Sequence, residues 1–252
     1  MRLFVSEPLY TGQSLTLPPG PTRHAQVRRV QPGVSLWLFD GHGHDWPAQV
    51  QAVTRSAVQV TVGAPVVVAN ELPLAVTLAV GMPANERMDT LVEKATELGV
   101  AVIQPLLCER AVLRLSGERA ARKCVHWQAI AEAACEQSGR AVVPRVAEVL
   151  TLPQWLAVQA DPVGALRLVL SPRPGATPLV LPRVEPSTPR QAVISLSGPE
   201  GGLSPAEEAA AVAAGFAPTS LGPRVLRADT APLALMALMA WSGLPRPGLL
   251  TG

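Results

Sequence analysis

The feature that most constrains the fold is a strand–helix–strand pattern in the middle of the 252-residue chain. Residues 74–80 form an apolar run typical of a buried strand, and residues 100–106 form a second one. Between them, residues 86–98 repeat their apolar side chains at the spacing of one helix face. Asn85 is the predicted N-cap of this helix, and Gly99 is predicted to end it. Two strands joined by a crossover helix predict an α/β fold with a parallel sheet.

The second half of the chain continues the alternation of strands and helices. A long helix is predicted over residues 118–138, with Gly139 ending it. Further strands are predicted over residues 166–171 and 192–197. Prolines are frequent between these two strands, in residues 172–190, and they exclude a helix or a central strand there. We therefore predict a long surface loop over that segment.

Residues 1–71 show a different pattern, in which short strands alternate with turn signals. The predicted strands are 2–5, 36–39, 46–53 and 56–62, and the predicted turns are 18–20, 32–33 and 40–43. Several short strands in a small space predict a little barrel or sandwich. We expect two domains, a small β domain over residues 1–71 and an α/β domain over residues 72–252.

Composition excludes two classes of protein. With 48% hydrophobic residues and a net charge of +2, the chain is too apolar and too weakly charged to stay disordered. Its apolar runs, such as 231–241, fall short of the roughly 20 residues that a membrane-spanning helix needs. The N-terminus reaches Glu7 and Pro8 without the apolar core of a signal peptide. We expect a cytoplasmic protein that makes no membrane contact.

Two residue types bear on the binding partners. Lys94 and Lys123 are the only lysines among the 21 Lys and Arg residues, so nearly every positive charge is a guanidinium. Arginine pairs with phosphates and stacks on bases, which suits nucleic acid, although a GC-rich genome favours Arg codons equally well. With a net charge of +2, a local patch would have to bind a polyanion. Cys108, Cys124 and Cys135 lack the spacing of a zinc site, so we expect no bound metal.

Two glycine-containing turns follow predicted strands, the first after the strand at 192–197 and the second after a short strand predicted at 219–221. SGPEGG at 197–202 precedes a helix whose predicted capping box is formed by Ser204 and Glu207. LGPRVLR at 221–227 leads into an apolar helix at 231–241. Ligands of parallel sheets lie at the carboxyl ends of the strands, and glycine lets the backbone approach them closely. The two turns together predict a small-molecule pocket, although each alone is consistent with tight loop geometry, and neither matches a GxGxxG or Walker A pattern.

Further blocks along the chain make the pattern specific. They are LFDGHGHDW at 38–46, RMDTLVEKATELGV at 87–100, CERAV at 108–112, HWQAIAEAACEQSGRAVVP at 126–144, SGPEGGLSPAEE at 197–208 and LGPRVLRADTA at 221–231. In these blocks the chain closely resembles the SPOUT methyltransferases that modify small-subunit ribosomal RNA, and among them the uridine-N3 methyltransferases. The resemblance covers nearly the whole chain.

The resemblance implies a fold and an activity. It implies a C-terminal SPOUT domain with a trefoil knot, which is a rare exception to unknotted topology, and an N-terminal PUA-like β-barrel that helps to hold RNA. It further implies a homodimer that uses S-adenosylmethionine to methylate N3 of a uridine in small-subunit ribosomal RNA, with the assembled subunit as substrate. Two alternatives stay open. They are an RNA methyltransferase with another target, such as the ribose 2′-oxygen, and an RNA-binding protein without activity.

By the same resemblance, the cofactor is expected between three loops, after Leu170 and in the two glycine turns. The expected cofactor-binding residues are Leu170, Gly198, Glu200, Gly201, Gly202, Leu221, Gly222, Val225 and Leu226.

Arg227 and Glu200 are the candidate catalytic residues. A guanidinium at Arg227 can contact the target nucleotide or stabilise N3 as its proton leaves, and its alternative role is an ion pair with Asp229 or Glu200. Glu200 can orient the cofactor or the substrate, and its alternative role is to cap the following helix.

RNA contact is expected from basic residues of both domains, although surface charge explains any one of them equally well. The candidates are Arg2, His24, Arg28, Arg29, Arg87, Arg110 and Arg114. The helix at 231–241 is apolar on more than one face, so we expect it to be buried within its own domain or in a dimer interface.

Overall fold

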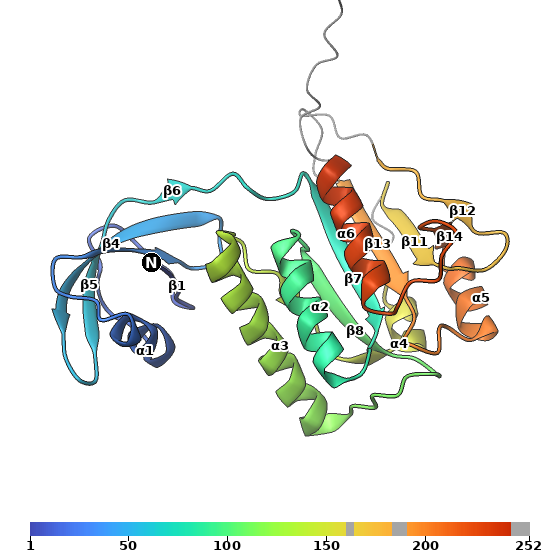
Figure 1. The fold of residues 1–252 in the computed structure, drawn as a ribbon, viewed down its shortest axis with the longest axis horizontal. Helices are drawn as coiled ribbons and strands as arrows, with labels where there is room; N and C mark the ends of the chain where they lie inside the picture. Colours follow the sequence, from blue (N-terminus) through green and yellow to red (C-terminus); the bar gives the residue numbers. More distant parts are fainter. Residues whose placement is uncertain (160–163, 183–190, 243–252) are drawn as a thin grey trace, which may run out of the picture. The chain divides into compact units, whose positions relative to one another are not determined.

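The computed structural model describes residues 1–159, 164–182 and 191–242, which fold into two compact units (Figure 1). Unit 1 consists of Met1–Glu71 together with Glu132–Val143. Unit 2 consists of Leu72–Ala131 together with the described residues from Pro144 onward. The chain therefore leaves unit 1 after Glu71 and returns to it once, through the end of a long helix.

Unit 1 is built on a six-stranded sheet with the strand order β1-β3-β4-β5-β2, in which β6 pairs with β4. Its strands are β1 (Arg2–Phe4), β2 (Ser14–Thr16), β3 (Ser35–Phe39), β4 (His44–Val53), β5 (Val58–Val62) and β6 (Val66–Val67). Leu38, Val50 and Val60 belong to one buried core, as the alternation of apolar residues along these strands predicts. The four predicted strands are confirmed as β1, β3, β4 and β5.

The predicted turn at 18–20 is wrong, because helix α1 (Pro19–Val27) begins there. Proline is tolerated at the first position of a helix, where its missing N–H would have no partner. Thr22 and Ala25 are the buried residues of α1, and the Thr22 hydroxyl donates a 2.7 Å hydrogen bond to the carbonyl of Leu17. Two buried residues give only a weak helical periodicity in the sequence, whereas a Pro-Pro-Gly sequence is a strong signal for a turn.

Unit 2 contains an eight-stranded sheet whose strands are all parallel, which confirms the predicted α/β fold. The strand order is β10-β8-β7-β13-β11-β14-β12, with β9 paired to β8. The strands are β7 (Leu74–Gly81), β8 (Val102–Leu107), β9 (Arg145–Val146), β10 (Leu150–Thr151), β11 (Leu166–Leu170), β12 (Thr177–Pro178), β13 (Gln191–Ser197) and β14 (Ala217–Ser220). The predicted strands of this unit are thus confirmed, with ends that differ by one or two residues.

The helices of unit 2 cover both faces of its sheet (Figure 1). They are α2 (Asn85–Glu97), the first part of α3 (Gly117–Ser138), α4 (Leu152–Ala157), α5 (Pro205–Ala213) and α6 (Thr230–Ser242). On one face, Leu91 of α2, Trp127 of α3 and Met236 of α6 share a buried cluster with Val193 of β13. On the other face, α4 and α5 pack against the next residue of β13, Ile194. Neighbouring residues of β13 thus point to opposite faces of the sheet, and both faces are buried. A strand in such a position needs apolar side chains on both faces, so its apolar residues follow one another without a break.

The ends of helices α2, α3 and α5 confirm most of the predicted signals. Gly139 follows the end of α3 with a φ of +79°, and Gly99 follows α2 with a φ of +93°. Ser204 and Glu207 form the predicted capping box at the start of α5. The predicted N-cap of α2 is wrong by one residue, because Ala84 holds that position and brings no capping side chain.

The proline-rich loop at 172–190 contains one short element within the described residues. Strand β12 (Thr177–Pro178) pairs with β14 at the edge of the sheet, where a proline is tolerated because one side of the strand needs no partner. The part of this loop at 183–190 lies outside the described residues. Across the described ranges, the helices include none long and apolar enough to cross a membrane.

Candidate functional site

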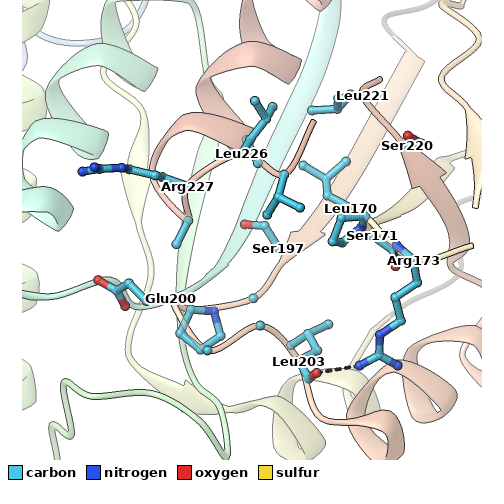
Figure 2. A pocket seen from close by; sticks show the side chains of 18 of the residues that line it. Leu170, Ser171, Arg173, Ser197, Glu200, Leu203, Ser220, Leu221, Leu226 and Arg227 are labelled. Carbon is cyan, nitrogen blue, oxygen red and sulfur yellow. Dashed lines mark hydrogen bonds between the residues drawn. The ribbon is translucent and has the colours of Figure 1, made fainter. Parts of the chain in front are cut away.

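The site lies in unit 2, where three neighbouring parallel strands end. Strands β13, β11 and β14 are adjacent in the sheet, so the segments after Ser197, Leu170 and Ser220 emerge at the same edge. Between these segments is a cavity of about 610 Å³ (Figure 2). A cavity of this size is typical of the binding site for a small molecule.

The cavity brings together all nine residues that sequence reasoning assigned to the cofactor. Its walls include Leu170, Gly198, Glu200, Gly201, Gly202, Leu221, Gly222, Val225 and Leu226. Arg227 lines the cavity as well. The walls also include Ser171, Arg173, Ser197, Leu203, Glu208 and Arg224, none of which was predicted as a site residue. Of these, Ser197 carries a recognisable signal, because it is a polar residue at the end of an apolar strand directly before a glycine turn.

The first glycine turn is closed tightly on itself. The Gly202 N–H donates a 2.8 Å hydrogen bond to the carbonyl of Pro199. A Cβ added to Gly198 would lie 2.6 Å from the backbone nitrogen of Leu203, which a real side chain cannot approach so closely. Any larger residue at Gly198 would therefore open the turn.

The second glycine turn depends on the backbone freedom of glycine for another reason. Gly222 has a φ of +119°, a conformation that L side chains rarely adopt. A Cβ added there would meet no atom of the described residues within 4 Å, and the residue borders the open cavity. Gly222 also donates its N–H to the hydroxyl of Ser220 at 3.2 Å.

Glu200 contacts the start of helix α2. One carboxylate oxygen accepts a 2.9 Å hydrogen bond from the N–H of Ala84, the N-cap residue. The same oxygen lies 3.6 Å from a guanidinium nitrogen of Arg87. The alternative role of Glu200, as a cap for the helix that follows it, is wrong, because Ser204 and Glu207 cap that helix. Glu200 thus accepts a hydrogen bond from the N-cap N–H of a distant helix, as a Glu at the third helical position does in a capping box.

Arg227 has an exposed side chain on the cavity wall. Figure 2 shows its guanidinium and the Glu200 carboxylate on the same side of the cavity, away from Leu203 and Arg173. Within the part of the chain that the structure describes, Arg227 makes no ion pair with Asp229 or Glu200, which was its alternative role. Its carbonyl accepts hydrogen bonds from the N–H groups of Thr230 and Ala231, where α6 begins.

The opposite wall is organised by Arg173. One guanidinium nitrogen lies 2.6 Å from a carboxylate oxygen of Glu208, and another donates a 3.1 Å hydrogen bond to the carbonyl of Leu203. Arg173 therefore links the loop after β11 to the end of the first glycine turn and to α5.

Two buried polar atoms near the cavity have no hydrogen-bond partner in the described ranges. They are the hydroxyl oxygen of Ser197, which lines the cavity, and one carboxylate oxygen of Asp229, directly before α6. The Ser197 side chain comes from a residue that is 3% exposed. A buried hydroxyl without a partner costs free energy unless something else satisfies it, and in a cavity wall that partner can be a ligand.

Arg2, a predicted RNA contact, has a structural role within unit 1. Its guanidinium forms a two-pronged contact with the carboxylate of Asp45 and donates to the carbonyls of Cys135 and Arg140. It also lies 3.7 Å from the ring centre of Phe39, and its side chain is 13% exposed. With its donors engaged inside the unit, Arg2 is not available to bind a phosphate.

The other RNA candidates of unit 1 are exposed. Arg28 and Arg29 stand at the end of α1, and Arg29 has a left-handed φ of +54°. The ring of His24 lies 3.5 Å from the Glu136 carboxylate, with its side chain 44% exposed. Arg23 is a further exposed cation on α1 that sequence reasoning had not singled out.

Two of the three RNA candidates of unit 2 line the cavity. Arg110 lines it and donates a 3.2 Å hydrogen bond to the carbonyl of Gly201, and Arg87 lines it beside Glu200. Arg114 is exposed and donates to the carbonyl of Glu109.

Neither the cysteines nor the acidic residues form a metal centre in the described parts of the chain. All three cysteines are free thiols, and burial raises the pKa of Cys108 to about 12 and that of Cys135 to about 11. Thiols with such pKa values stay protonated near neutral pH, and a metal ligand would have to be deprotonated.

Comparison with known families gives two matches. Residues 70–240 match the model of the RNA methyltransferase domain, and residues 22–63 match that of the RNA methyltransferase PUA domain. The first match covers well over half of the chain. The second falls within unit 1 and supports its assignment as a PUA-like domain.

Comparison with known proteins gives relatives that match most of the chain. The chain is 36% identical to the ribosomal RNA small subunit methyltransferase E of Synechocystis over 94% of the chain and 76% of the relative. It is 29% identical to the protein of the same name from Bacillus subtilis, over 85% of the chain and 84% of the relative.

Two solved structures are also similar over nearly their whole length. One is the ribosomal RNA small subunit methyltransferase E of Neisseria gonorrhoeae bound to S-adenosylmethionine, with a TM-score of 0.83, 35% identity, and coverage of 94% of this chain and 95% of that one. The other is a Legionella pneumophila protein in complex with the same cofactor, with a TM-score of 0.86, 32% identity, and coverage of 96% and 97%.

Proposed function

Because the chain belongs to the RNA methyltransferase family of the ribosomal RNA small subunit methyltransferases E, we propose that it methylates N3 of a uridine in small-subunit ribosomal RNA. The family makes it an S-adenosylmethionine-dependent methyltransferase of ribosomal RNA. The observation that carries the proposal for this chain is the cavity at the ends of β11, β13 and β14, which is walled by all the residues expected to bind the cofactor. The threading of the chain into a trefoil knot stays a prediction.

The residues of the cavity fit S-adenosylmethionine. The cavity has a volume of about 610 Å³, which suits a ligand of the size of S-adenosylmethionine. The two glycine turns present backbone groups to it, and the Ser197 hydroxyl offers an unused hydrogen-bonding group. Leu170, Leu221 and Leu226 supply apolar surface. When bound there, the cofactor supplies an activated methyl group on a positively charged sulfur.

In this proposal, Arg227 stabilises the target base. N3 of uridine attacks a methyl group most readily after it has lost its proton, so a nearby guanidinium favours reaction by stabilising the anionic base. An exposed arginine on the cavity wall that is free of an ion pair with the nearby carboxylates Asp229 and Glu200 can serve in this way. Because N3 is normally covered by pairing or stacking, the base must be unpaired or extruded to reach the cavity.

Glu200 acts in the proposal as a positioning residue rather than by touching the base. Its carboxylate is held by the Ala84 N–H and by Arg87. Through these contacts it keeps the first glycine turn against the start of α2, and it keeps the Arg87 guanidinium at the cavity wall.

RNA binding is assigned to exposed arginines of both units. In unit 1 these are Arg28, Arg29 and the newly recognised Arg23. In unit 2 they are Arg87, Arg110 and Arg114, of which the first two line the cavity. Phosphate contacts of this kind position a nucleic acid without reading its sequence. The substrate in this proposal is the assembled small subunit.

The proposed enzyme is a homodimer that uses helix α6. Burial within its own domain explains part of the apolar surface of α6, because Leu235, Met236 and Met239 are buried in unit 2. Trp241 and Leu238 are 71% and 37% exposed. A second copy of the chain would cover this remaining apolar face, and a monomer mass by light scattering at micromolar concentration would refute the dimer.

The deciding experiment is methylation with S-adenosylmethionine carrying a labelled methyl group. Purified small subunits and naked small-subunit RNA are incubated separately with the protein, and the RNA is digested to nucleosides. Label in N3-methyluridine, with assembled subunits as the better substrate, supports the proposal. Label in 2′-O-methylated nucleosides would replace the target, and binding of RNA without any transfer would replace the activity.

A further inference from the structure

The hydroxyl of Ser197 is a polar group whose purpose neither the fold nor the predicted site explains. It lies at the carboxyl end of β13, in a residue only 3% exposed. Its oxygen is buried and finds no hydrogen-bond partner in the parts of the chain that the structure describes. Alanine or valine would fill this position at the end of an apolar strand without that cost.

Ser195, on the same strand, is a buried serine that does not line the cavity, so it serves as a comparison for Ser197. It is 1% exposed, and its hydroxyl is also buried without a partner within the described ranges. Because residues two apart on a strand point to the same face, Ser195 and Ser197 face the same side of the sheet. Ser197 lines the cavity, whereas Ser195 is not among the residues of its wall. The two serines therefore differ in their access to a ligand.

The surroundings of Ser197 indicate which part of a ligand it meets. The Ser197 hydroxyl shares the cavity wall with the apolar side chains of Leu170, Leu221 and Leu226, and Figure 2 shows it below Leu226 and to the left of Leu170. The charged ends of Glu200, Arg227 and Arg173 lie toward the outer parts of the same view. An apolar region with a single hydroxyl suits an uncharged ring system with hydrogen-bonding edges, whereas a charged amino-acid group needs charged partners or water.

We propose that the Ser197 hydroxyl hydrogen-bonds the adenosine portion of S-adenosylmethionine. This inference rests on the proposed function, since it takes the cavity as the cofactor site. The hydroxyl can donate to a ring nitrogen and accept from an amino group, so it can serve either edge of the base.

The test compares Ser197→Ala with Ser195→Ala by isothermal titration. The ligands are S-adenosylmethionine, S-adenosylhomocysteine and 5′-methylthioadenosine, the last of which keeps the adenosine and lacks the amino-acid portion. Ser197→Ala is expected to weaken all three by the same factor, roughly two- to tenfold for one hydrogen bond. Ser195→Ala should leave all three affinities unchanged.

Thermal unfolding without ligand supplies a second readout. Each alanine variant removes a buried hydroxyl that has no partner, so neither should unfold at a lower temperature than the wild type. A loss of affinity in a variant that is as stable as the wild type is what a ligand contact predicts, and a purely structural serine would not produce it. If Ser197→Ala does not fold, Ser197→Thr and Ser197→Val give a pair of similar volume in which only the threonine keeps a hydroxyl.

Three outcomes count against the inference or its premise, and they are distinguishable. If the wild type binds S-adenosylmethionine and Ser197→Ala binds all three ligands equally well, Ser197 makes no contact. If only 5′-methylthioadenosine keeps its affinity, the hydroxyl meets the amino-acid portion and the assignment to adenosine is wrong. If the wild type itself binds none of the three ligands, the proposed function fails.

Discussion

Replacing Gly222 with valine tests where the cofactor cavity lies. Gly222 has a φ of +119°, and a Cβ built on it meets no atom within 4 Å. The cost to folding is therefore backbone strain rather than a steric clash, about 1–3 kcal/mol for a side chain in a sparsely populated conformation. For a chain of this size, that corresponds to a fall in the melting temperature of roughly 2 to 12 °C. The fold should survive.

The effect on ligand binding should be larger than the effect on stability. Gly222 borders the cavity, so a valine there either fills space that the cofactor needs or turns the Leu221–Arg227 backbone away from it. We expect the affinity for S-adenosylmethionine, measured by isothermal titration, to fall by roughly tenfold or more, since a loss of about 1.4 kcal/mol already gives this factor.

Gly33→Val is the matched control for Gly222→Val. Gly33 has a φ of +87° and also meets nothing within 4 Å of an added Cβ, but it belongs to unit 1. It should lower the melting temperature by a similar amount and leave cofactor affinity unchanged. Wild-type affinity in Gly222→Val, or an equal loss of affinity in both variants, would refute the placement of the cavity at this turn.

Four further predictions concern individual side chains. Arg28→Ala with Arg29→Ala should raise the KM for RNA and lower the slope of log affinity against log salt by roughly 1.5 to 2, as expected when two phosphate contacts are lost, with cofactor affinity unchanged in titration. Arg227→Ala should instead lower kcat, by roughly 100-fold, with a smaller change in RNA binding, because its contact strengthens as the base becomes anionic. Glu200→Ala should lower the melting temperature by about 2–4 °C, since loss of a helix-start acceptor costs about 1 kcal/mol, and Glu200→Gln, which keeps an acceptor, should lower it less. Burial raises the pKa of Cys108 from 9.0 to about 12, so the contribution of this thiol to stability is complete below pH 9 and declines as the pH rises towards 12. Urea unfolding across that range should therefore show a smaller loss of stability with rising pH in Cys108→Ala than in the wild type.

The elements that sequence reasoning predicted well are those with local signals. The capping box at Ser204 and Glu207 involves residues three apart, and the first glycine turn follows directly on the mostly apolar strand β13. The parallel sheet follows from the alternation of strands and helices, which a single chain displays in order. Helix α1 was missed because Pro19 and Gly20 signal a turn more strongly than its two buried residues signal a helix.

The side-chain roles that were missed depend on partners far away in sequence. Arg2 looked like a free cation near the N-terminus, but its partners Asp45 and the carbonyl of Cys135 lie 43 and 133 residues away. Glu200 looked like a cap for the next helix, and it instead contacts Ala84, 116 residues away. Charge alone does not identify such partners, because nothing in the local sequence records which strands and helices become neighbours.

The same long-range contacts make the two glycine turns physically different. The first turn is attached to three other parts of unit 2. Glu200 binds the start of α2, Gly201 accepts a hydrogen bond from Arg110, and Pro199 packs so closely on Gly81 of β7 that a Cβ there would lie 2.5 Å from it. The second turn is held by bonds between near neighbours, such as those joining Ser220 and Gly222, and its Val225 is 81% exposed. The position of the first turn is thus set by distant parts of the fold, whereas the second turn is held mainly by contacts among its own residues.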